Sequence, residues 1–462
     1  MTKSVNEREI VLAALLEVTE KGAYSHQILR DVLFKYQYLE KRERAFITRV
    51  TEGTLEHLIE IDYILDQFSK VKVRKMKPVI RGILRSSVYQ LKYMDSVPDR
   101  AVCSEAVKLA ARKGFSGLKG YVNGVLRNVA RGLADVAYPR DRKQELSVRY
   151  SCPEWIVDLW QKEFGQETAE TMIRSLSGER PLTVRCCRSR ISVEELRERL
   201  AQEGVKTEIH PYLPYALYIS GYDHLEGLGS FREGLFAVQD VSSMLVGELA
   251  APCAGAQILD VCAAPGGKSL HAAEELLLAA AASGRPEEQG MVEARDLTEY
   301  KVDLIRENIE RFRMENVQAV CRDAAVPDPD WKEKADIVLA DLPCSGLGVM
   351  GKKPDLRYRI SPADIKDLAA LQKKILSCAQ ACVKPGGTLI YSTCTVSREE
   401  NTDNVRWFLK EYPEFLQEDI SGRLCPELRG ALTDEGCLQL LPGIHKSDGF
   451  FIAKLRRREG GT

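Results

Sequence analysis

Two cysteines lie at positions where covalent chemistry is possible. Cys344 belongs to the string 341–346 (DLPCSG) and Cys394 to the string 392–395 (STCT), and each string directly follows an apolar run typical of a buried strand. Strand ends of an open α/β sheet are where cofactor and substrate meet. Two thiols converging there indicate covalent catalysis by a thiolate. The alternative is a pair of buried structural thiols, which is the commoner fate of cysteine.

A glycine-rich turn precedes both cysteines. Gly266 and Gly267 allow the backbone to turn sharply, and the helix expected over 268–278 presents its amino end there. The turn follows the first predicted strand of an alternating β/α region, as in nucleotide-binding folds, although a plain strand-to-helix turn has the same pattern. It lacks the spacing of a nucleoside-triphosphate loop. We predict a cofactor-binding turn made of Cys262, Ala263, Ala264, Pro265, Gly266, Gly267 and Lys268.

Three acidic residues stand at the ends of later strands. Asp296 ends the second predicted strand, where a carboxylate can accept hydrogen bonds from a ribose diol. Asp323 follows the third strand and could accept from an adenine amine, and Asp341 ends the fourth. Each alone also fits a loop or N-cap carboxylate. Three of them around one turn favour a nucleotide-like cofactor.

The region from about 236 to 457 must position these residues. Short apolar runs alternate there with helical patterns, which predicts a doubly wound, mainly parallel, Rossmann-like α/β sheet. The predicted strands are 256–261, 290–294, 317–320, 335–340, 388–392 and 450–455.

Residues 1–140 are expected to be all-helical, because apolar residues recur at helical spacing without an alternating strand pattern. Residues 1–150 hold 28 Lys and Arg against 18 Asp and Glu, a net +10 in a chain of net −1. Such a basic module favours a nucleic-acid partner, although a mixed solvated surface gives the same count. The predicted helices include 9–19, 42–65, 79–91 and 102–113, and 137–143 is a predicted linker.

A small α+β module is predicted over 146–235, from two helical patterns followed by short strands. Arginines surround its first strand, 182–187. They could contact phosphate or solvate an edge strand, and we favour phosphate. These arginines are Arg180, Arg185, Arg188 and Arg190.

Thirteen cysteines without a framework spacing, and a start without a signal-peptide core, predict reduced thiols in a cytoplasmic protein. No apolar stretch approaches the ~18 residues that span a bilayer, so no membrane contact is expected. The absence of Cys-x-x-Cys and His-x-x-x-His argues against structural zinc, and no metal is expected. We expect a monomer.

The helical region resembles the NusB family of RNA-binding domains. The string 120–127 (GYVNGVLR) is the sharpest part of the resemblance, which also rests on 8–16, 62–65 and 98–113. It implies binding of structured RNA, with a helical platform for protein docking as the alternative.

Residues 236–455 resemble the S-adenosylmethionine-dependent RNA cytosine-5 methyltransferases. Two cysteines in these two contexts distinguish that family from the DNA enzymes. One departure is Arg295, since such enzymes usually have an apolar strand before the aspartate. The matching strings are 259–268, 341–346, 353–358, 392–395 and 448–451.

The resemblance implies S-adenosylmethionine as cofactor and a role for each matched residue. Cys394 would be the nucleophile that adds to carbon-6 of cytosine, and Cys344 would serve the later loss of the carbon-5 proton. Asp341 would hydrogen-bond the ring edge near nitrogen-3, with electrostatic help from Lys268.

The combination with a NusB-like region resembles bacterial enzymes that methylate 16S ribosomal RNA. The implied partner is small-subunit ribosomal RNA, deproteinised or partly assembled. A transfer-RNA cytosine-5 methyltransferase and a non-catalytic RNA-binding or ribosome-assembly factor are the alternatives. The predicted domains are 1–140 (NusB-like), 146–235 (the α+β module) and 236–457 (methyltransferase).

Overall fold

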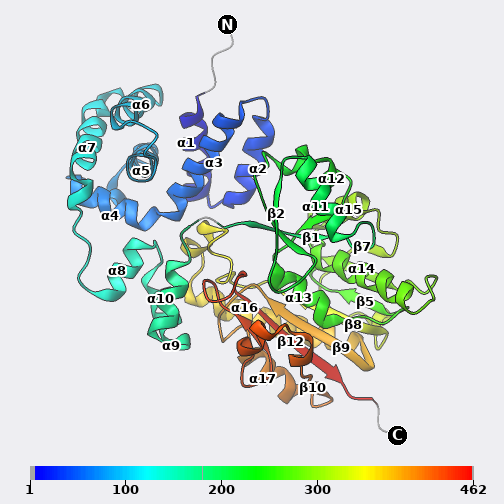
Figure 1. Ribbon diagram of the computed structural model, residues 1–462. Helices are drawn as coiled ribbons and strands as arrows, with labels where there is room; N and C mark the ends of the chain where they lie inside the picture. Colours follow the sequence, from blue (N-terminus) through cyan, green and yellow to red (C-terminus); the bar gives the residue numbers. More distant parts are fainter. Residues whose placement is uncertain (1–5, 179, 460–462) are drawn as a thin grey trace. The chain divides into compact units, whose positions relative to one another are not determined.

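The computed structural model describes residues 6–178 and 180–459, which divide into two compact units. The first unit runs to Gly178 and also contains Met350–Ile360, and the second contains the remainder. Each has its own buried apolar core. Figure 1 colours the chain from end to end and labels its elements. No helix among the described residues is long and apolar enough to cross a membrane.

The first unit is helical, as predicted for residues 1–140, and it also contains the helices between Glu154 and Arg174, which were predicted as part of the α+β module. Its amphipathic helices bury one apolar face each, with Val11, Leu84 and Val129 among the fully buried residues. The helices are α1 (Glu7–Lys21), α2 (Ser25–Lys35), α3 (Lys41–Glu56), α4 (Leu58–Phe68), α5 (Pro78–Tyr93), α6 (Asp99–Arg112), α7 (Lys119–Gly132), α8 (Arg142–Arg149), α9 (Glu154–Phe164) and α10 (Gln166–Arg174).

Two helix boundaries differ from the prediction. The predicted helix 42–65 is two helices, because His57 leaves helical geometry between α3 and α4 and stacks on Tyr93 with ring centroids 4.0 Å apart. The predicted linker 137–143 ends early. Asp141 accepts a hydrogen bond from the Gln144 amide at 2.9 Å and thereby caps α8, which begins at the next residue.

The segment Met350–Ile360 folds into this helical unit, although it comes from the methyltransferase-like part of the sequence. Arg357 is fully buried, and its guanidinium donates to the carbonyl oxygens of Glu56 at 3.3 Å and Tyr150 at 3.1 Å. Ser25 Oγ donates to Asp355 at 2.5 Å. The string 353–358 thus has an anchoring role that its sequence did not indicate.

The second unit contains a large mixed sheet with the strand order β10-β12-β9-β8-β5-β6-β7, and β11 pairs with β12. Strands β5 to β9 are parallel, β12 runs antiparallel to β9, and β10 and β11 each pair antiparallel with β12. The six predicted strands are confirmed, and two three-residue strands were missed. The strands are β5 (Gln257–Asp260), β6 (Met291–Asp296), β7 (Val317–Cys321), β8 (Ala335–Asp341), β9 (Val383–Thr393), β10 (Phe415–Gln417), β11 (Leu438–Leu440) and β12 (Phe450–Arg457).

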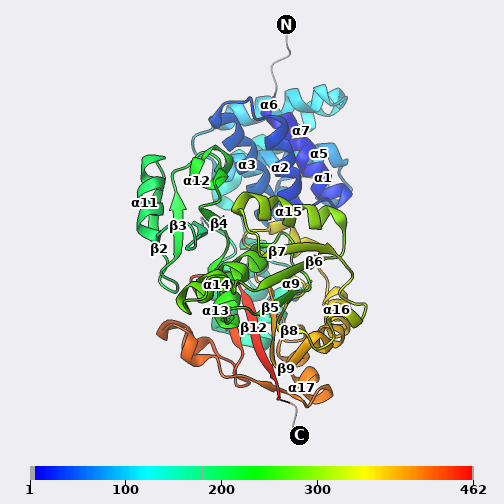
Figure 2. The same cartoon turned by 90° about the vertical axis from the view of Figure 1, so that its right-hand side faces the viewer.

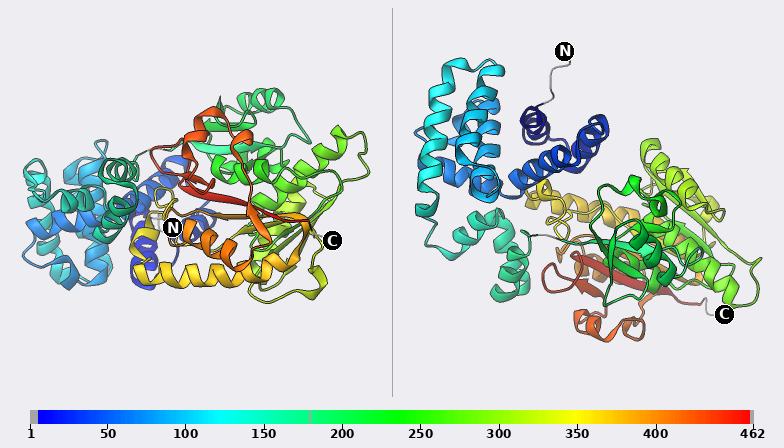
Figure 3. Two further views of the ribbon diagram at one scale, coloured as in Figure 1. Left: turned by 90° about the horizontal axis from the view of Figure 1, so that it is seen from below. Right: turned by 45° about the horizontal axis from the view of Figure 1, so that its top comes forward.

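Helices cover both faces of this sheet (Figures 2 and 3). In β8, Ile337 and Leu339 join one apolar cluster, while Val338 and Ala340 join the other. This alternation follows from the two-residue period of a strand and makes the sheet doubly wound. The first cluster includes residues of α13 (Val241–Ala250), α14 (Gly267–Ala282) and α15 (Glu299–Phe312), and the second includes residues of α16 (Pro362–Ala379) and α17 (Thr402–Glu411).

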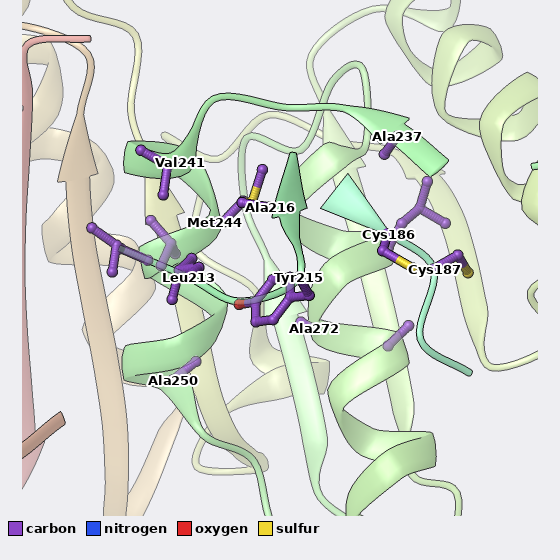
Figure 4. Packing of buried hydrophobic residues seen from close by; sticks show 14 of the residues in the cluster. Cys186, Cys187, Leu213, Tyr215, Ala216, Ala237, Val241, Met244, Ala250 and Ala272 are labelled. Carbon is purple, nitrogen blue, oxygen red and sulfur yellow. The ribbon is translucent and has the colours of Figure 1, made fainter. Parts of the chain in front are cut away.

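The α+β module contributes a small antiparallel sheet with the order β2-β3-β1-β4. Its apolar face packs on α13 and α14 in one continuous core, part of which is shown in Figure 4. The elements are β1 (Leu182–Cys186), α11 (Val193–Gln202), β2 (Lys206–Ile209), β3 (Ala216–Ser220), α12 (Gly229–Arg232) and β4 (Phe236–Val238).

Both interpretations of the arginines are wrong for Arg185. Its strand, β1, lies between β3 and β4 rather than at an edge, and its side chain is fully buried. The guanidinium forms an ion pair with Glu274 of α14 and donates to Gln239 at 2.9 Å. Arg188 likewise pairs with Glu275. These cations serve packing of the module on α14, because a buried charge requires a partner.

Candidate active site

The chain leaves β5 where the strand order reverses, since β6 and β7 lie on one side of β5 and β8 and β9 on the other. Ligands of open α/β sheets bind at such switch points. The following turn holds Gly266 at φ 102°, a left-handed conformation that favours glycine. A Cβ atom at Gly267 would meet no heavy atom within 4 Å. The first turn of α14 is therefore open to a ligand.

A buried carboxyl group, Asp260, closes the base of this turn. It accepts hydrogen bonds from Ser269 Oγ at 2.6 Å and from the Cys262 amide at 3.3 Å. Burial raises the pKa of Asp260 to about 7, and the nearby Asp341 charge adds to the rise. The bonds join the end of β5 to α14 and fix the shape of the turn.

Asp296 lies opposite the turn at the end of β6. Its carboxylate accepts from the Ala264 amide at 3.0 Å and from Lys301 Nζ at 2.9 Å. The preceding Arg295 is buried and pairs with Glu293 and with Asp328, the latter at 2.7 Å. This arginine therefore satisfies its charge inside the fold and leaves the geometry of Asp296 intact.

Two other predicted cofactor residues have local partners. Asp323 Oδ1 accepts from the Ala325 amide at 2.8 Å, which shapes the loop after β7. Burial raises the pKa of the Cys262 thiol, so Cys262 stays protonated at neutral pH.

Lys268 and Asp341 meet across the switch point. Lys268 Nζ lies 2.7 Å from Asp341 Oδ2, and Ser392 Oγ donates to Asp341 Oδ1 at 2.8 Å. Burial opposes the lysine charge, but the Asp341 carboxylate overrides it and raises the pKa of Lys268. Lys268 therefore keeps its charge at neutral pH, and the pair joins the ends of β5, β8 and β9.

The two predicted cysteines converge. Cys344 Sγ and Cys394 Sγ are 3.2 Å apart, and both residues are half-buried. The hydrogen bond with Cys394, together with burial, raises the pKa of Cys344 well above its usual value. The thiols are thus close enough to act on one small group, and Cys344 retains its proton.

A backbone contact and a buried carboxylate hold the two cysteine loops together. The Gly348 amide donates to Cys394 O at 3.1 Å, and the Gly449 amide donates to Gly348 O at 2.9 Å. Ser345 Oγ lies 2.7 Å from Thr395 Oγ1 and donates to Glu400 at 2.5 Å. The residue after each cysteine therefore takes part in one hydrogen-bonded group.

Sequence reasoning missed three buried residues that hold the site in place. Asp260 bonds Ser269, Glu400 bonds Ser345, and Gln372 bonds Glu400. Asp260 had a readable signal, because a carboxylate inside an apolar strand is unusual. Glu400 stands in a polar string, REEN, that looks solvated, and Gln372 is one polar residue of a long helix. In the part of the chain that the structure covers, no group of three or more His, Cys, Asp or Glu side chains could hold a metal ion.

Comparison with known proteins extends over the whole chain. The "Probable ribosomal RNA small subunit methyltransferase B" of Bacillus subtilis is 35% identical over 99% of this chain and 100% of its own length. The "Ribosomal RNA small subunit methyltransferase B" of Cronobacter sakazakii is 31% identical over 99% and 100%. Among solved structures, the crystal structure of PH0851 is 26% identical, covers 98% of this chain and 99% of that one, and has a TM-score of 0.82.

A second solved structure, NSun6 from Pyrococcus horikoshii with SFG, covers 67% of this chain and 99% of its own, with 25% identity and a TM-score of 0.57. Family matches cover the three regions of the chain. Residues 5–131 match the NusB family, 152–223 match the RsmF/B-like ferredoxin-like domain, and 248–456 match 16S rRNA methyltransferase RsmB/F.

The doubly wound sheet, the glycine turn at its switch point and the paired cysteines define a methyltransferase of the RNA-modifying class. The chain belongs to the RsmB/F family of 16S rRNA methyltransferases.

Proposed function

We propose that this protein transfers a methyl group from S-adenosylmethionine to carbon-5 of a specific cytosine in 16S ribosomal RNA. The observation that carries the proposal is the 3.2 Å approach of Cys344 and Cys394 beside the Lys268–Asp341 pair. The named relatives support the ribosomal substrate, because they align with the chain over nearly its whole length.

The turn 262–268 fits a nucleoside cofactor, since it offers an open helix amino end and faces the Asp296 carboxylate. Asp296 would accept from the ribose hydroxyls and Asp323 from the adenine amine, with the turn beneath them. When bound, S-adenosylmethionine supplies an electrophilic methyl group. Asp341, at the end of β8, is the last of the predicted cofactor-binding residues.

The protein's own groups activate the cytosine, whose carbon-5 is a weak nucleophile. Cys394 loses its proton, and the thiolate forms a bond to carbon-6. The electron pair of the carbon-5–carbon-6 double bond then becomes available at carbon-5, which takes the methyl group. Loss of the carbon-5 proton finally restores the double bond and releases Cys394 as thiolate.

Cys344 and Asp341 serve different steps of this cycle. Cys344 lies 3.2 Å from Cys394, so it is placed to serve the elimination step, in which the carbon-5 proton leaves and the bond to Cys394 breaks. Asp341 would hydrogen-bond the ring edge near nitrogen-3, and Lys268 holds the carboxylate in place. The target base must leave its stack to reach this pocket.

The domains are proposed to divide the work. Residues 1–140 and 146–235 would bind structured ribosomal RNA, deproteinised or partly assembled, and 236–457 would carry the chemistry. The net +10 of residues 1–150 supports the first assignment. A monomeric, cytoplasmic protein without a metal or membrane contact remains the prediction from sequence.

Methyl transfer from labelled S-adenosylmethionine tests the proposal. Deproteinised small-subunit ribosomal RNA, a partly assembled small subunit and transfer RNA would be compared, with bisulfite sequencing of the product. One methylated cytosine in ribosomal RNA is expected. Label in transfer RNA alone would overturn the substrate, and no label in any RNA by folded protein would overturn the activity.

A further inference from the structure

A fully buried glutamate joins the two cysteine loops at the residues that directly follow the thiols. Glu400 accepts from the Ser345 amide at 2.8 Å and from Ser345 Oγ at 2.5 Å. Ser345 Oγ in turn lies 2.7 Å from Thr395 Oγ1. A single carboxylate is thus tied to the loop of Cys344 and, through one hydroxyl, to the loop of Cys394.

Gln372 of α16 holds the other side of the Cys344 loop. Its Nε2 donates to Pro343 O at 2.9 Å and to Glu400 at 3.1 Å. Its Oε1 accepts from Tyr391 at 3.1 Å and from Asn404 at 2.8 Å. The residues before and after Cys344 are therefore both fixed by the same buried network.

Burying a carboxylate at this position costs desolvation free energy, so the charge is tolerated only when several hydrogen-bond donors compensate it. Here the donors come from the loop itself and from α16. Burial raises the pKa of Glu400, while the hydrogen bonds from Ser345 and Gln372 oppose the rise. A neutral amide of the same size would fill the same space.

Charged groups face the two thiols from several elements. The hydrogen bond with Cys394 and burial are the main causes of the raised pKa of Cys344, and the charges of Glu400 and Asp341 add to the rise. Lys268, on α14, and a thiolate at Cys394 attract each other. Tyr391 on β9 also interacts with Cys344, and burial raises the pKa of its phenol. Two carboxylates thus act on Cys344, while a lysine acts on Cys394.

We propose that Glu400 is a positioning residue that sets the two cysteine loops in register and, through its charge, keeps Cys344 as the thiol so that Cys394 is the thiolate. This inference rests on the proposed function, because it assigns the choice of nucleophile in that reaction. Glu400 is fully buried and acts through its hydrogen bonds with Ser345 and Gln372 and through its charge.

The test is the pH dependence of alkylation at each thiol. The intact protein would be treated with iodoacetamide from pH 6 to pH 9, and peptide mass spectrometry would give the rate at Cys344 and at Cys394. In the unchanged protein Cys394 should react at least about 10-fold faster near neutral pH, because the thiolate is the reactive form. In Glu400→Gln this ratio should fall at least about threefold, and the Cys344 profile should move to lower pH.

Glu399→Gln is the matched control, since Glu399 is the exposed neighbour on the same loop. It should leave both profiles unchanged. Methyl transfer by Glu400→Gln should show kcat reduced about 100-fold with KM for S-adenosylmethionine within about twofold, the pattern of a misplaced group. Because alkylation needs no RNA, it decides the role of Glu400 even if the proposed substrate is wrong.

An unchanged alkylation ratio in folded Glu400→Gln would overturn the inference. If that variant fails to fold, Ser345→Ala replaces it. This substitution removes the bridging hydroxyl and keeps the hydrogen bond from the backbone amide of residue 345 to Glu400. A ratio shifted in the same direction by a smaller factor is then expected, and an unchanged ratio in Ser345→Ala would equally reject the proposal.

Discussion

The two ends of the site hold their polar groups in different ways. The cofactor end is the turn 262–268 with Asp260 and Asp296, and the cysteine end is the pair of loops that carry Cys344 and Cys394. At the cofactor end, the buried carboxyl group of Asp260 bonds Ser269, which is only nine residues away. At the cysteine end, Ser345 and Glu400 are 55 residues apart, and the contacts join separate strands and a helix. The first is a local device and the second is assembled by the tertiary fold.

This difference has a consequence for sensitivity. A local turn keeps its shape when a distant element shifts, whereas two loops that meet through one carboxylate depend on every element that carries a partner. Substitutions at the cofactor end should therefore change affinity or stability in isolation. Substitutions at the cysteine end should change the rate of reaction.

The largest effect is expected from Cys394→Ala. Methyl transfer should fall below about 10⁻⁴ of the normal rate, since the thiolate that activates the ring is missing. RNA affinity, measured by filter binding, should be unchanged. Cys253→Ala, at an exposed thiol, is the control and should keep full activity. Residual activity of more than a few per cent in Cys394→Ala would show that Cys394 is not the nucleophile.

Asp260→Asn probes the buried carboxyl group at the cofactor end. The pKa of Asp260 in the folded protein, about 7, is above the unfolded value of 3.8, so the folded state keeps a proton that the unfolded state releases. Stability is therefore lost as the pH rises through this window, by up to about 4 kcal/mol for this group.

Chemical denaturation at pH 5 and at pH 8 would measure this effect. The asparagine variant cannot titrate, so it should gain stability relative to the unchanged protein between the two pH values. Equal differences at both pH values would show that Asp260 is ionised throughout.

Asp296→Asn should weaken cofactor binding about 10- to 100-fold, because a hydrogen bond to a charged group contributes about 1.5–3 kcal/mol. Calorimetry with S-adenosylmethionine would measure it, and kcat at saturating cofactor should be nearly normal. Asp303→Asn, at an exposed carboxylate on α15, is the control. A lower kcat with normal affinity would show that Asp296 acts in the methyl-transfer reaction and not in cofactor binding.

Gly348→Ala tests how tightly the cysteine loops meet. An added Cβ would collide with the Gly449 carbonyl and lie 2.8 Å from Cys394 O. A loss of about 1–3 kcal/mol in unfolding free energy is expected, together with reduced activity. Gly422→Ala, where nothing lies within 4 Å, should change neither. Normal activity in Gly348→Ala would show that the loops tolerate separation.

Local motifs and the order of the strands were predictable from the sequence. The glycine turn, the strand ends with Lys268 and Asp341, and the convergence of Cys344 with Cys394 all follow from the order of elements in a doubly wound sheet. The strands β10 and β11 were missed, because three residues carry no usable periodicity.

Contacts that do not follow from the order of the strands were not predictable. Arg185 looks like a surface cation in sequence, and only its pairing with Glu274 of α14 shows that it is buried. Arg357 lies in a methyltransferase-like string, yet its partners are carbonyl groups of the helical unit. Glu400 is likewise indistinguishable from its exposed neighbour until the fold brings Ser345 to it.

The covalent role of the cysteines can be tested most directly with Cys344→Ala. This variant would be incubated with small-subunit ribosomal RNA and S-adenosylmethionine and resolved on a denaturing gel. Because elimination is blocked while addition by Cys394 is not, a protein–RNA adduct should persist, and it should vanish in the Cys344→Ala/Cys394→Ala double variant. No adduct in Cys344→Ala with methyl transfer intact, or an adduct that survives in the double variant, would contradict the assigned roles.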